Sequence, residues 1–377
     1  MNVTIEGHCD ERFAAVRTAM TANFAEHGDV GASVAIVHDG EMVVDLWGGC
    51  ADAERATPWQ RDTIVNVWST TKTMTALCAL MLADRGDIAF DAPVAKYWPE
   101  FAANGKDAIE VRHLMSHTAG LAGWTEPVTI TDILDWDRAT ELLAAQPTWW
   151  EPGTASGYHA LTQGYLVGEV VRRVTGVSLG TFFRDELATP LGADFHIGTS
   201  DEHVDRISNV IPPTDRLGAD QGPDSFAAQM LTNPPLDATV AWTPEWRRAE
   251  SPAANGHGNA RSVARVQSVL SHGGTIDGHE YLSSAGCDAV FDVQSSGTDL
   301  VLGVPLTLGI GYGLNSESTP IGTSPRTCFW GGWGGSIVVN DLDRRLTVAY
   351  VMNKMGEGTL GDMRGINVVF AALMSVM

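Results

Sequence analysis

The stretch NVWSTTKTMTALCALMLADRG, residues 66–86, combines the pattern of a buried helix with a serine and a lysine three positions apart. Apolar residues recur at positions 74, 77, 78, 81 and 82, which predicts a helix packed on a core and ending at Gly86. Ser69 lies in its first turn, where unpaired main-chain N–H groups and the helix dipole favour negative charge on a nearby oxygen. Lys72 follows one turn later and can reach Ser69 over the same face.

Lys72 is one of only four lysines in the 377 residues, and it falls among residues suited to burial. A desolvated lysine has a lowered pKa, which suits proton transfer, so Ser69 and Lys72 are candidates for a nucleophile and its base. The alternative is a serine that caps the helix and a lysine that reaches outward to solvent. A Ser-x-x-Lys pattern is too short to decide between these readings by itself.

Two further segments carry candidate functional residues. The first, EPGTASGYHALTQGYLVGEVVRRVTG at 151–176, places Tyr158 in a glycine-rich loop before an amphipathic helix. The second, FWGGWGGSIVVND at 329–341, has glycines around Trp330 and Trp333 at the entry to a strand, and an edge strand there would offer free N–H groups to a ligand. The structural alternatives are a tyrosine that covers the core and a bulge in a twisted strand.

The two ends of the chain predict a common sheet. An amphipathic helix over 11–27 precedes two apolar runs joined by Asp39-Gly40, a strong hairpin signal. Segments 306–315, 328–341 and 344–353 each predict one further strand, and 362–377 a helix. We therefore predict an α/β fold plus an all-helical region. Residues 1–87 plus 265–377 form an antiparallel sheet domain flanked by helices, residues 88–264 form a mainly helical domain, and the active site lies at their interface.

Taken together, these segments resemble the serine β-lactamase and penicillin-binding protein superfamily. Its Ser-x-x-Lys motif corresponds to Ser69 and Lys72, its tyrosine motif to Tyr158-His159-Ala160, and its Lys-Thr-Gly motif to Trp330-Gly331-Gly332. LMSHTAGL at 114–121 is also typical of this group. The order and spacing are similar to those of class C β-lactamases and family VIII carboxylesterases. The resemblance implies a β-lactamase-like fold in which an α/β domain built from both chain ends encloses a helical domain.

Two departures from the family pattern concern the substrate. Ala160 replaces an amide that would hold the side chain of a β-lactam antibiotic, and Trp330 replaces a lysine that would meet its carboxylate. The resemblance therefore implies an uncharged ester in an apolar pocket. The residues expected to bind it are Trp330, Gly331, Gly332, Trp333, Trp68, Trp150 and His159, with Trp124 and Trp149 as further apolar walls.

These observations predict a serine carboxylesterase for short-chain or aryl esters that works through an acyl-enzyme on Ser69. Tyr158, with a phenol pKa lowered by Lys72, would take or relay the serine proton, although either residue could be the base. By the family's geometry, the main-chain N–H groups of Ser69 and Trp333 would form the oxyanion hole. The alternatives are a β-lactamase or D-alanyl peptidase, an acyltransferase that uses the same acyl-enzyme, and a non-enzymatic binding homologue.

Composition argues against other classes of partner. The formal net charge of −22 and the absence of a basic stripe disfavour nucleic acid. The first residues lack the pattern of a signal peptide, no apolar run is long enough to span a bilayer, and five dispersed cysteines fit reduced thiols, so we expect a cytoplasmic protein without a membrane partner. No metal or cofactor motif occurs. The expected partner is a small-molecule ester, and no oligomeric state is predicted.

Two further patterns compete with the site at Ser69. GVSLG at 176–180 matches the Gly-x-Ser-x-Gly elbow of α/β-hydrolases around Ser178, but a helix rather than a strand is predicted before it. His117, His159 and His257 are candidate partners for a serine, but none has a spacing that implies this role. We expect Ser178 to begin a helix and the three histidines to be structural.

Overall fold

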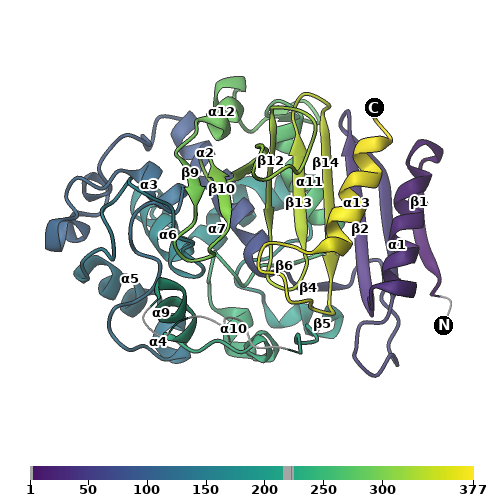
Figure 1. The fold of residues 1–377 in the computed structure, drawn as a ribbon, viewed down its shortest axis with the longest axis horizontal. Coiled ribbons are helices and arrows are strands. Elements are labelled where there is room, and N and C mark those ends of the chain that lie inside the picture. The colour runs from purple at the N-terminus through teal and green to yellow at the C-terminus, as the bar shows by residue number, and fades with distance from the viewer. Residues whose placement is uncertain (1–2, 215–221, 223–224) are drawn as a thin grey trace.

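The computed structural model describes residues 3–214, 222 and 225–377. Its centre is a nine-stranded antiparallel sheet with the strand order β1-β3-β2-β14-β13-β12-β11-β10-β9 (Figure 1). The strands come from both ends of the chain: β1 (Ile5–Cys9), β2 (Gly31–His38), β3 (Glu41–Gly49), β9 (Ser295–Thr298), β10 (Pro305–Leu308), β11 (Gly313–Leu314), β12 (Thr327–Gly331), β13 (Ile337–Asp341) and β14 (Leu346–Met352). The predicted sheet of both termini is therefore confirmed.

The β2–β3 hairpin shows how local sequence sets this sheet. Asp39 and Gly40 both have positive φ, at 50° and 84°, as a two-residue turn that follows the twist of the strands requires. β2 is buried along nearly its whole length and pairs with β14 from Ala32↔Met352 to His38↔Leu346. This pairing joins the two ends of the chain in the middle of the sheet.

The glycine-rich segment 328–341 differs from its prediction as one strand with a free edge. It forms two strands, β12 and β13, because Gly334 and Gly335, with φ of 91° and 134°, reverse the chain between them. β12 lies inside the sheet, between β13 and β11. Segment 306–315 likewise divides into β10 and β11.

Helices cover both faces of the sheet. α11 (Ala260–Ser271) packs on β2, β13 and β14 from one side, where the hydroxyls of Ser271 and Thr347 are 2.8 Å apart. α13 (Met363–Met374) packs on β14 from the other side, with α1 (Ala14–Glu26) beside it (Figure 1). The predicted terminal helices are therefore confirmed.

The segment between the two halves of the sheet is mainly helical. Besides α2 (Thr71–Asp84) and α12 (Ser284–Asp288), the remaining helices are α3 (Val111–Met115), α4 (Ile130–Leu134), α5 (Trp136–Ala145), α6 (Thr162–Thr175), α7 (Leu179–Phe183), α8 (Thr189–Leu191), α9 (Phe226–Thr232) and α10 (Pro244–Arg248). The segment is not all-helical, because β5 (Ile207–Ser208) and β6 (His257–Gly258) pair with β4 (Ile64–Asn66). A short hairpin of β7 (Thr275–Ile276) and β8 (His279–Glu280) follows α11.

α2 connects these parts of the fold. It is buried on all sides and packs against α6 and α7 as well as against α11 and α12. The predicted domain limit at 264/265 would cut α11, so we propose that the limit lies before this helix.

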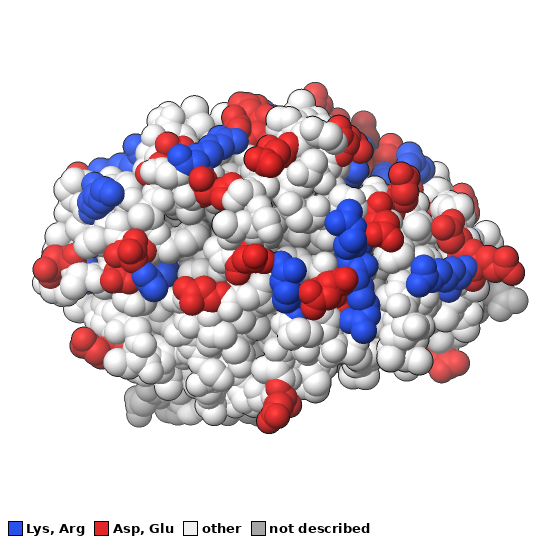
Figure 2. Space-filling view, turned by 90° about the horizontal axis from the view of Figure 1, so that it is seen from above, with Lys and Arg blue, Asp and Glu red and all other residues white. Residues whose placement is uncertain are grey.

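The surface carries charged side chains of both signs. On the face seen in Figure 2, Asp and Glu side chains lie next to most of the Lys and Arg side chains. None of the described helices combines the length and the apolar character needed to cross a bilayer.

α6 approaches the loop at 252–253 so closely that one of its positions requires glycine. A Cβ added to Gly164 would lie 2.4 Å from the main-chain nitrogen of Ala253 and 2.8 Å from the carbonyl carbon of Pro252. Both atoms belong to the main chain, which cannot turn aside as a side chain does. The same loop supplies the carbonyl oxygen of Ala253, which Lys72 contacts.

We expect Gly164→Ala to lower the free energy of unfolding by about 1–3 kcal/mol, as overpacking does in a buried site. Helix propensity alone would predict a gain of about 1 kcal/mol from the same change. Chemical denaturation of the parent and the variant measures the difference. An unchanged or increased stability would contradict the close approach of α6 to this loop.

Candidate active site

Ser69 lies in a short 3-10 turn, Trp68–Thr70, that leads directly into α2. Trp68 has a φ of 48°, a conformation that costs a non-glycine residue energy and that is found mainly where the surrounding structure enforces it. Thr71 stabilises the turn by donating from Oγ1 to the main-chain oxygen of Trp68 at 2.6 Å. The strained turn fixes the serine hydroxyl at the N-terminal end of α2, as the sequence predicts.

Lys72 is completely buried behind Ser69. Its Nζ lies 3.1 Å from Oγ of Ser69, 2.7 Å from the main-chain oxygen of Ala160 and 3.0 Å from that of Ala253. Within the described part of the chain, no carboxylate forms an ion pair with it. Burial therefore lowers the pKa of Lys72 well below its ordinary value.

The three contacts of Lys72 match the three N–H bonds of an ammonium, and a neutral amine can make them as well. Such an amine has two N–H bonds and one lone pair. The carbonyl oxygens of Ala160 and Ala253 can accept both N–H bonds, which leaves the lone pair directed at the Ser69 hydroxyl. Lys72 is thus arranged to accept the serine proton.

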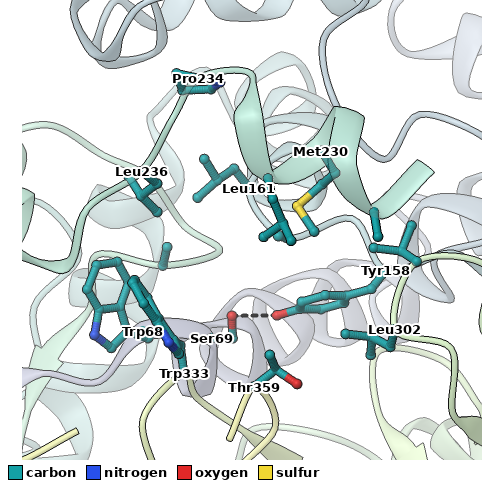
Figure 3. A pocket seen from close by; sticks show the side chains of 15 residues that line it. Trp68, Ser69, Tyr158, Leu161, Met230, Pro234, Leu236, Leu302, Trp333 and Thr359 are labelled. Carbon is teal, nitrogen blue, oxygen red and sulfur yellow. Dashed lines mark hydrogen bonds between the residues drawn. The ribbon is translucent and has the colours of Figure 1, made fainter. Parts of the chain in front are cut away.

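Tyr158 contacts the same serine from the other side. Its hydroxyl donates to Oγ of Ser69 at 2.5 Å (Figure 3), and Nζ of Lys72 lies 4.9 Å from the centre of its ring. Burial raises the pKa of the Tyr158 phenol, the charge of Asp299 raises it further, and the hydrogen bond with Ser69 acts in the opposite direction. The expectation that this pKa is lowered is wrong, because burial raises it and outweighs the hydrogen bonds that act in the opposite direction. Tyr158 is arranged as a proton donor.

The β12–β13 turn is held against the nucleophile turn. Oγ of Ser336 donates to the main-chain oxygen of Val67 at 2.9 Å and lies 2.9 Å from Oγ1 of Thr70. Gly332 permits this contact, since a Cβ there would lie 2.3 Å from the same oxygen of Val67. In the described chain, the N–H of Trp333 donates to no main-chain oxygen. Its role in an oxyanion hole stays a prediction, as does that of the N–H of Ser69.

A cavity of about 160 Å³ opens above Ser69 (Figure 3). Of the described side chains that line it, none is charged and most are apolar. α9 and the loop after it form one wall, and residues 301–302 form another. Lining residues that the sequence analysis missed include Leu161, Met230, Pro234, Leu236, Val301 and Leu302. These aliphatic residues come from distant segments and carry no local signal, because each one alone looks like a core residue.

The cavity includes only part of the predicted set of substrate-binding residues. Trp68 and Trp333 line it, with ring centres 4.9 Å apart. The predicted residues Trp330, Gly331, Gly332, Trp150 and His159 lie outside the lining. Trp330 is 1% exposed and stacks on His117 at 5.3 Å. The two glycines serve chain packing, since a Cβ at Gly331 would collide with the main chain of Leu360 at 2.3 Å.

The other predicted aromatic walls are also structural. Trp124 packs on Tyr165, and Trp149 stacks on Phe226. Trp150 lies edge-on to His159.

The histidines near the site bond to the main chain rather than to Ser69. His159 is fully buried, accepts from the N–H of Leu121 through Nε2 and contacts the oxygen of Gly157 through Nδ1. His117 accepts from the N–H of His159, and burial lowers its pKa well below the ordinary value. His257 is buried against the oxygen of Asn255, and burial lowers its pKa to about 3. All three are therefore neutral at physiological pH.

Ser178 begins a helix, as predicted. It caps α7 by accepting from the N–H of Thr181 at 3.2 Å, and its hydroxyl donates to Glu250 at 2.6 Å.

Across the described residues, no group of three or more His, Cys, Asp or Glu side chains is arranged to hold a metal ion.

Comparison with known proteins identifies the class to which this fold and this serine-lysine-tyrosine cluster belong. The family model for Beta-lactamase matches residues 16–373, so the chain belongs to the beta-lactamase family. The resemblance inferred from the sequence is thereby confirmed.

Individual relatives carry both esterase and penicillin-binding names. "Esterase/beta-lactamase LipL" of Mycobacterium tuberculosis is 37% identical over 369 residues, which cover 93% of this chain and 83% of that protein. The crystal structure of a family VIII carboxylesterase is 41% identical, with a TM-score of 0.93 over 99% of this chain and 100% of that one. A penicillin-binding protein homolog from Caulobacter crescentus is also 41% identical, with a TM-score of 0.91 over the same shares.

The geometry predicts how the reactivity of Ser69 depends on its neighbours. A fluorophosphonate probe should label Ser69, and Lys72→Arg should slow the labelling by about 10²- to 10⁴-fold, because a guanidinium stays protonated and cannot accept the serine proton. In the parent, the rate should rise with pH as Lys72 loses its proton and level off above a pKa well below 10.5. Intact-mass kinetics measures the rate, and peptide mapping locates the label.

Ser178→Ala is the matched control and should be labelled at the parental rate. A label on Ser178 would contradict Ser69 as the nucleophile. A parental labelling rate in Lys72→Arg would show that Lys72 is not the base.

Proposed function

We propose that this protein is a serine carboxylesterase that hydrolyses esters of short acyl or aryl groups through an acyl-enzyme on Ser69. The observation that carries the proposal is a serine hydroxyl bonded to both a buried lysine and a tyrosine at the floor of an uncharged, mainly apolar cavity. Relatives named as an esterase/beta-lactamase and as a family VIII carboxylesterase support it.

In the proposed reaction, Lys72 accepts the proton of Ser69 as the serine oxygen attacks the ester carbonyl. The N–H groups of Ser69 and Trp333 stabilise the oxyanion. Tyr158, which its raised pKa keeps protonated, gives its proton to the leaving alcohol, and the ammonium of Lys72 restores it. Water then attacks the acyl-enzyme, and the carboxylic acid leaves.

The electrostatics of the cavity favour an ester over a β-lactam. A β-lactam antibiotic carries a carboxylate, and burying it without a cation would be costly. Among the described residues, no charged side chain lines the cavity. Trp330, which stands where the family has a lysine, is stacked against His117 and adds no charge.

The volume of the cavity limits the group that it can hold. An apolar protein cavity of about 150 Å³ is large enough for a benzene molecule. The cavity of about 160 Å³ above Ser69 therefore suits a butanoyl to hexanoyl chain or a single aromatic ring. The partner that we propose is a small-molecule ester, and the cytoplasmic location stays a prediction.

A panel of chromogenic substrates tests the proposal. We expect the highest kcat/KM for p-nitrophenyl butyrate or hexanoate, at least about tenfold lower values for the dodecanoate because its chain exceeds the cavity, and at least about 10³-fold lower values for nitrocefin because of its carboxylate. Initial rates of purified protein give these ratios.

Ser69→Ala should abolish both turnover and the acyl-enzyme seen by mass spectrometry. Near-parental turnover in this variant would refute the mechanism, and faster hydrolysis of nitrocefin than of every ester would make the protein a β-lactamase. Formation of a new ester in the presence of an added alcohol would identify an acyltransferase that uses the same intermediate.

A further inference from the structure

Asp299 connects the segment of Tyr158 to the wall of the cavity. Its Oδ1 accepts three main-chain N–H bonds, from Tyr158 at 3.0 Å, from Val301 at 3.0 Å and from Leu302 at 2.9 Å. The last two residues line the cavity above Ser69. One carboxylate oxygen therefore holds a residue of the reacting cluster and part of the substrate pocket together.

The main chain strengthens the same connection. The N–H of Leu300 donates to the oxygen of Ser156 at 2.8 Å, and the loop closes on itself between Asp299 and Val304 at 3.0 Å. The loop that follows β9 is thus bonded twice to the segment 156–158, although 141 residues separate Asp299 from Tyr158 in the chain.

The other oxygen of Asp299 makes this arrangement costly. The residue is 1% exposed, and Oδ2 has no hydrogen-bond partner among the described residues. A buried carboxylate that is only half satisfied lowers stability, and an amide would serve the three N–H bonds with less desolvation. Features that lower stability without a packing gain occur mainly at functional sites.

We propose that Asp299 is a positioning residue that sets the Tyr158 hydroxyl on Ser69 and at the same time fixes the Val301–Leu302 wall of the acyl pocket. The inference rests on the proposed esterase function. It makes proton donation by Tyr158 and the fit of the acyl chain depend on a single side chain that touches neither the serine nor the cavity.

Three substitutions separate the bonds that Asp299 accepts within its own loop from the bond that it accepts from Tyr158. Asp299→Asn keeps an oxygen for all three N–H groups and should retain kcat within about threefold. Asp299→Ser retains a hydroxyl that can bond within its own loop, as serine does in turns, but it is too short to reach Tyr158. We expect it to fold and to lower kcat by about 10- to 100-fold, as small displacements of a reacting group do. Asp299→Ala should lose at least as much and should also reduce the preference for butyrate over acetate.

A double-mutant cycle with Tyr158→Phe shows whether Asp299 affects kcat through the Tyr158 hydroxyl. If Asp299 acts through the tyrosine, Asp299→Ser should change kcat by less than about threefold in the Tyr158→Phe background. Asp52→Ala is the matched control, because Asp52 also accepts two loop amides, from Ala56 and Thr57, and lies outside the cavity lining. It should keep the parental kcat and KM.

The inference would be overturned by a parental kcat in Asp299→Ser, by an equal loss with and without the Tyr158 hydroxyl, or by an Asp299→Asn variant as impaired as Asp299→Ser. If Asp299→Ala does not fold, the serine and asparagine variants still decide. Ser69→Ala is assayed in parallel: turnover in that variant would refute the proposed function, whereas an inactive Ser69→Ala with an unaffected Asp299→Ser would refute this inference alone.

Discussion

The site depends on a lysine that is buried without a counter-ion. Moving an ammonium out of water costs several kcal/mol unless a carboxylate compensates, and Lys72 has two carbonyl oxygens and a serine hydroxyl instead. Burying Lys72 as a neutral amine, without its proton, costs less free energy than burying the ammonium. The fold therefore creates a candidate base at Lys72 through desolvation, which requires the surrounding helices to exclude water from Nζ.

The arrangement of the helices follows from this requirement. The two carbonyl oxygens belong to Ala160, just before α6, and to Ala253, in the loop against which α6 packs. Gly164 lets α6 touch that loop, since a Cβ there would lie 2.4 Å from the main-chain nitrogen of Ala253. α2 brings the lysine to the two carbonyl oxygens, and its N-terminal turn presents Ser69 to the cavity. The close packing of α2 and α6 is thus also a requirement of the chemistry.

The sequence predicted the features that depend on local patterns. Turn chemistry, helical periodicity and motif spacing each depend on a short segment of sequence. They therefore predict the Asp39-Gly40 hairpin, the buried α2 and the cluster of Ser69, Lys72 and Tyr158. The turn between β12 and β13 was missed, because glycines that reverse a chain and glycines that admit a ligand look alike in sequence.

The properties that arise from burial in three dimensions could not be predicted in this way. The predicted direction of the pKa shift of Tyr158 is wrong because burial raises this pKa, and only the folded structure decides how deeply the phenol is buried. Residue type alone predicts that the tryptophans line the pocket, yet Trp330 stacks on His117 and Trp150 lies edge-on to His159. Asp299 gave no signal beyond that of an ordinary turn residue.

These electrostatic features act in the same direction, and together they favour the uncharged ester that we propose as the substrate. Burial lowers the pKa of Lys72 and of His117 and raises that of Tyr158, so all three shifts favour the uncharged form at the floor of the site. An anionic substrate would gain little there, and its negative charge would raise the pKa of Lys72 and so weaken it as a base. A neutral ester leaves that pKa low until the reaction begins. In the proposed reaction, the negative charge then appears on the oxyanion, next to the N-terminal end of α2, where the helix dipole favours it.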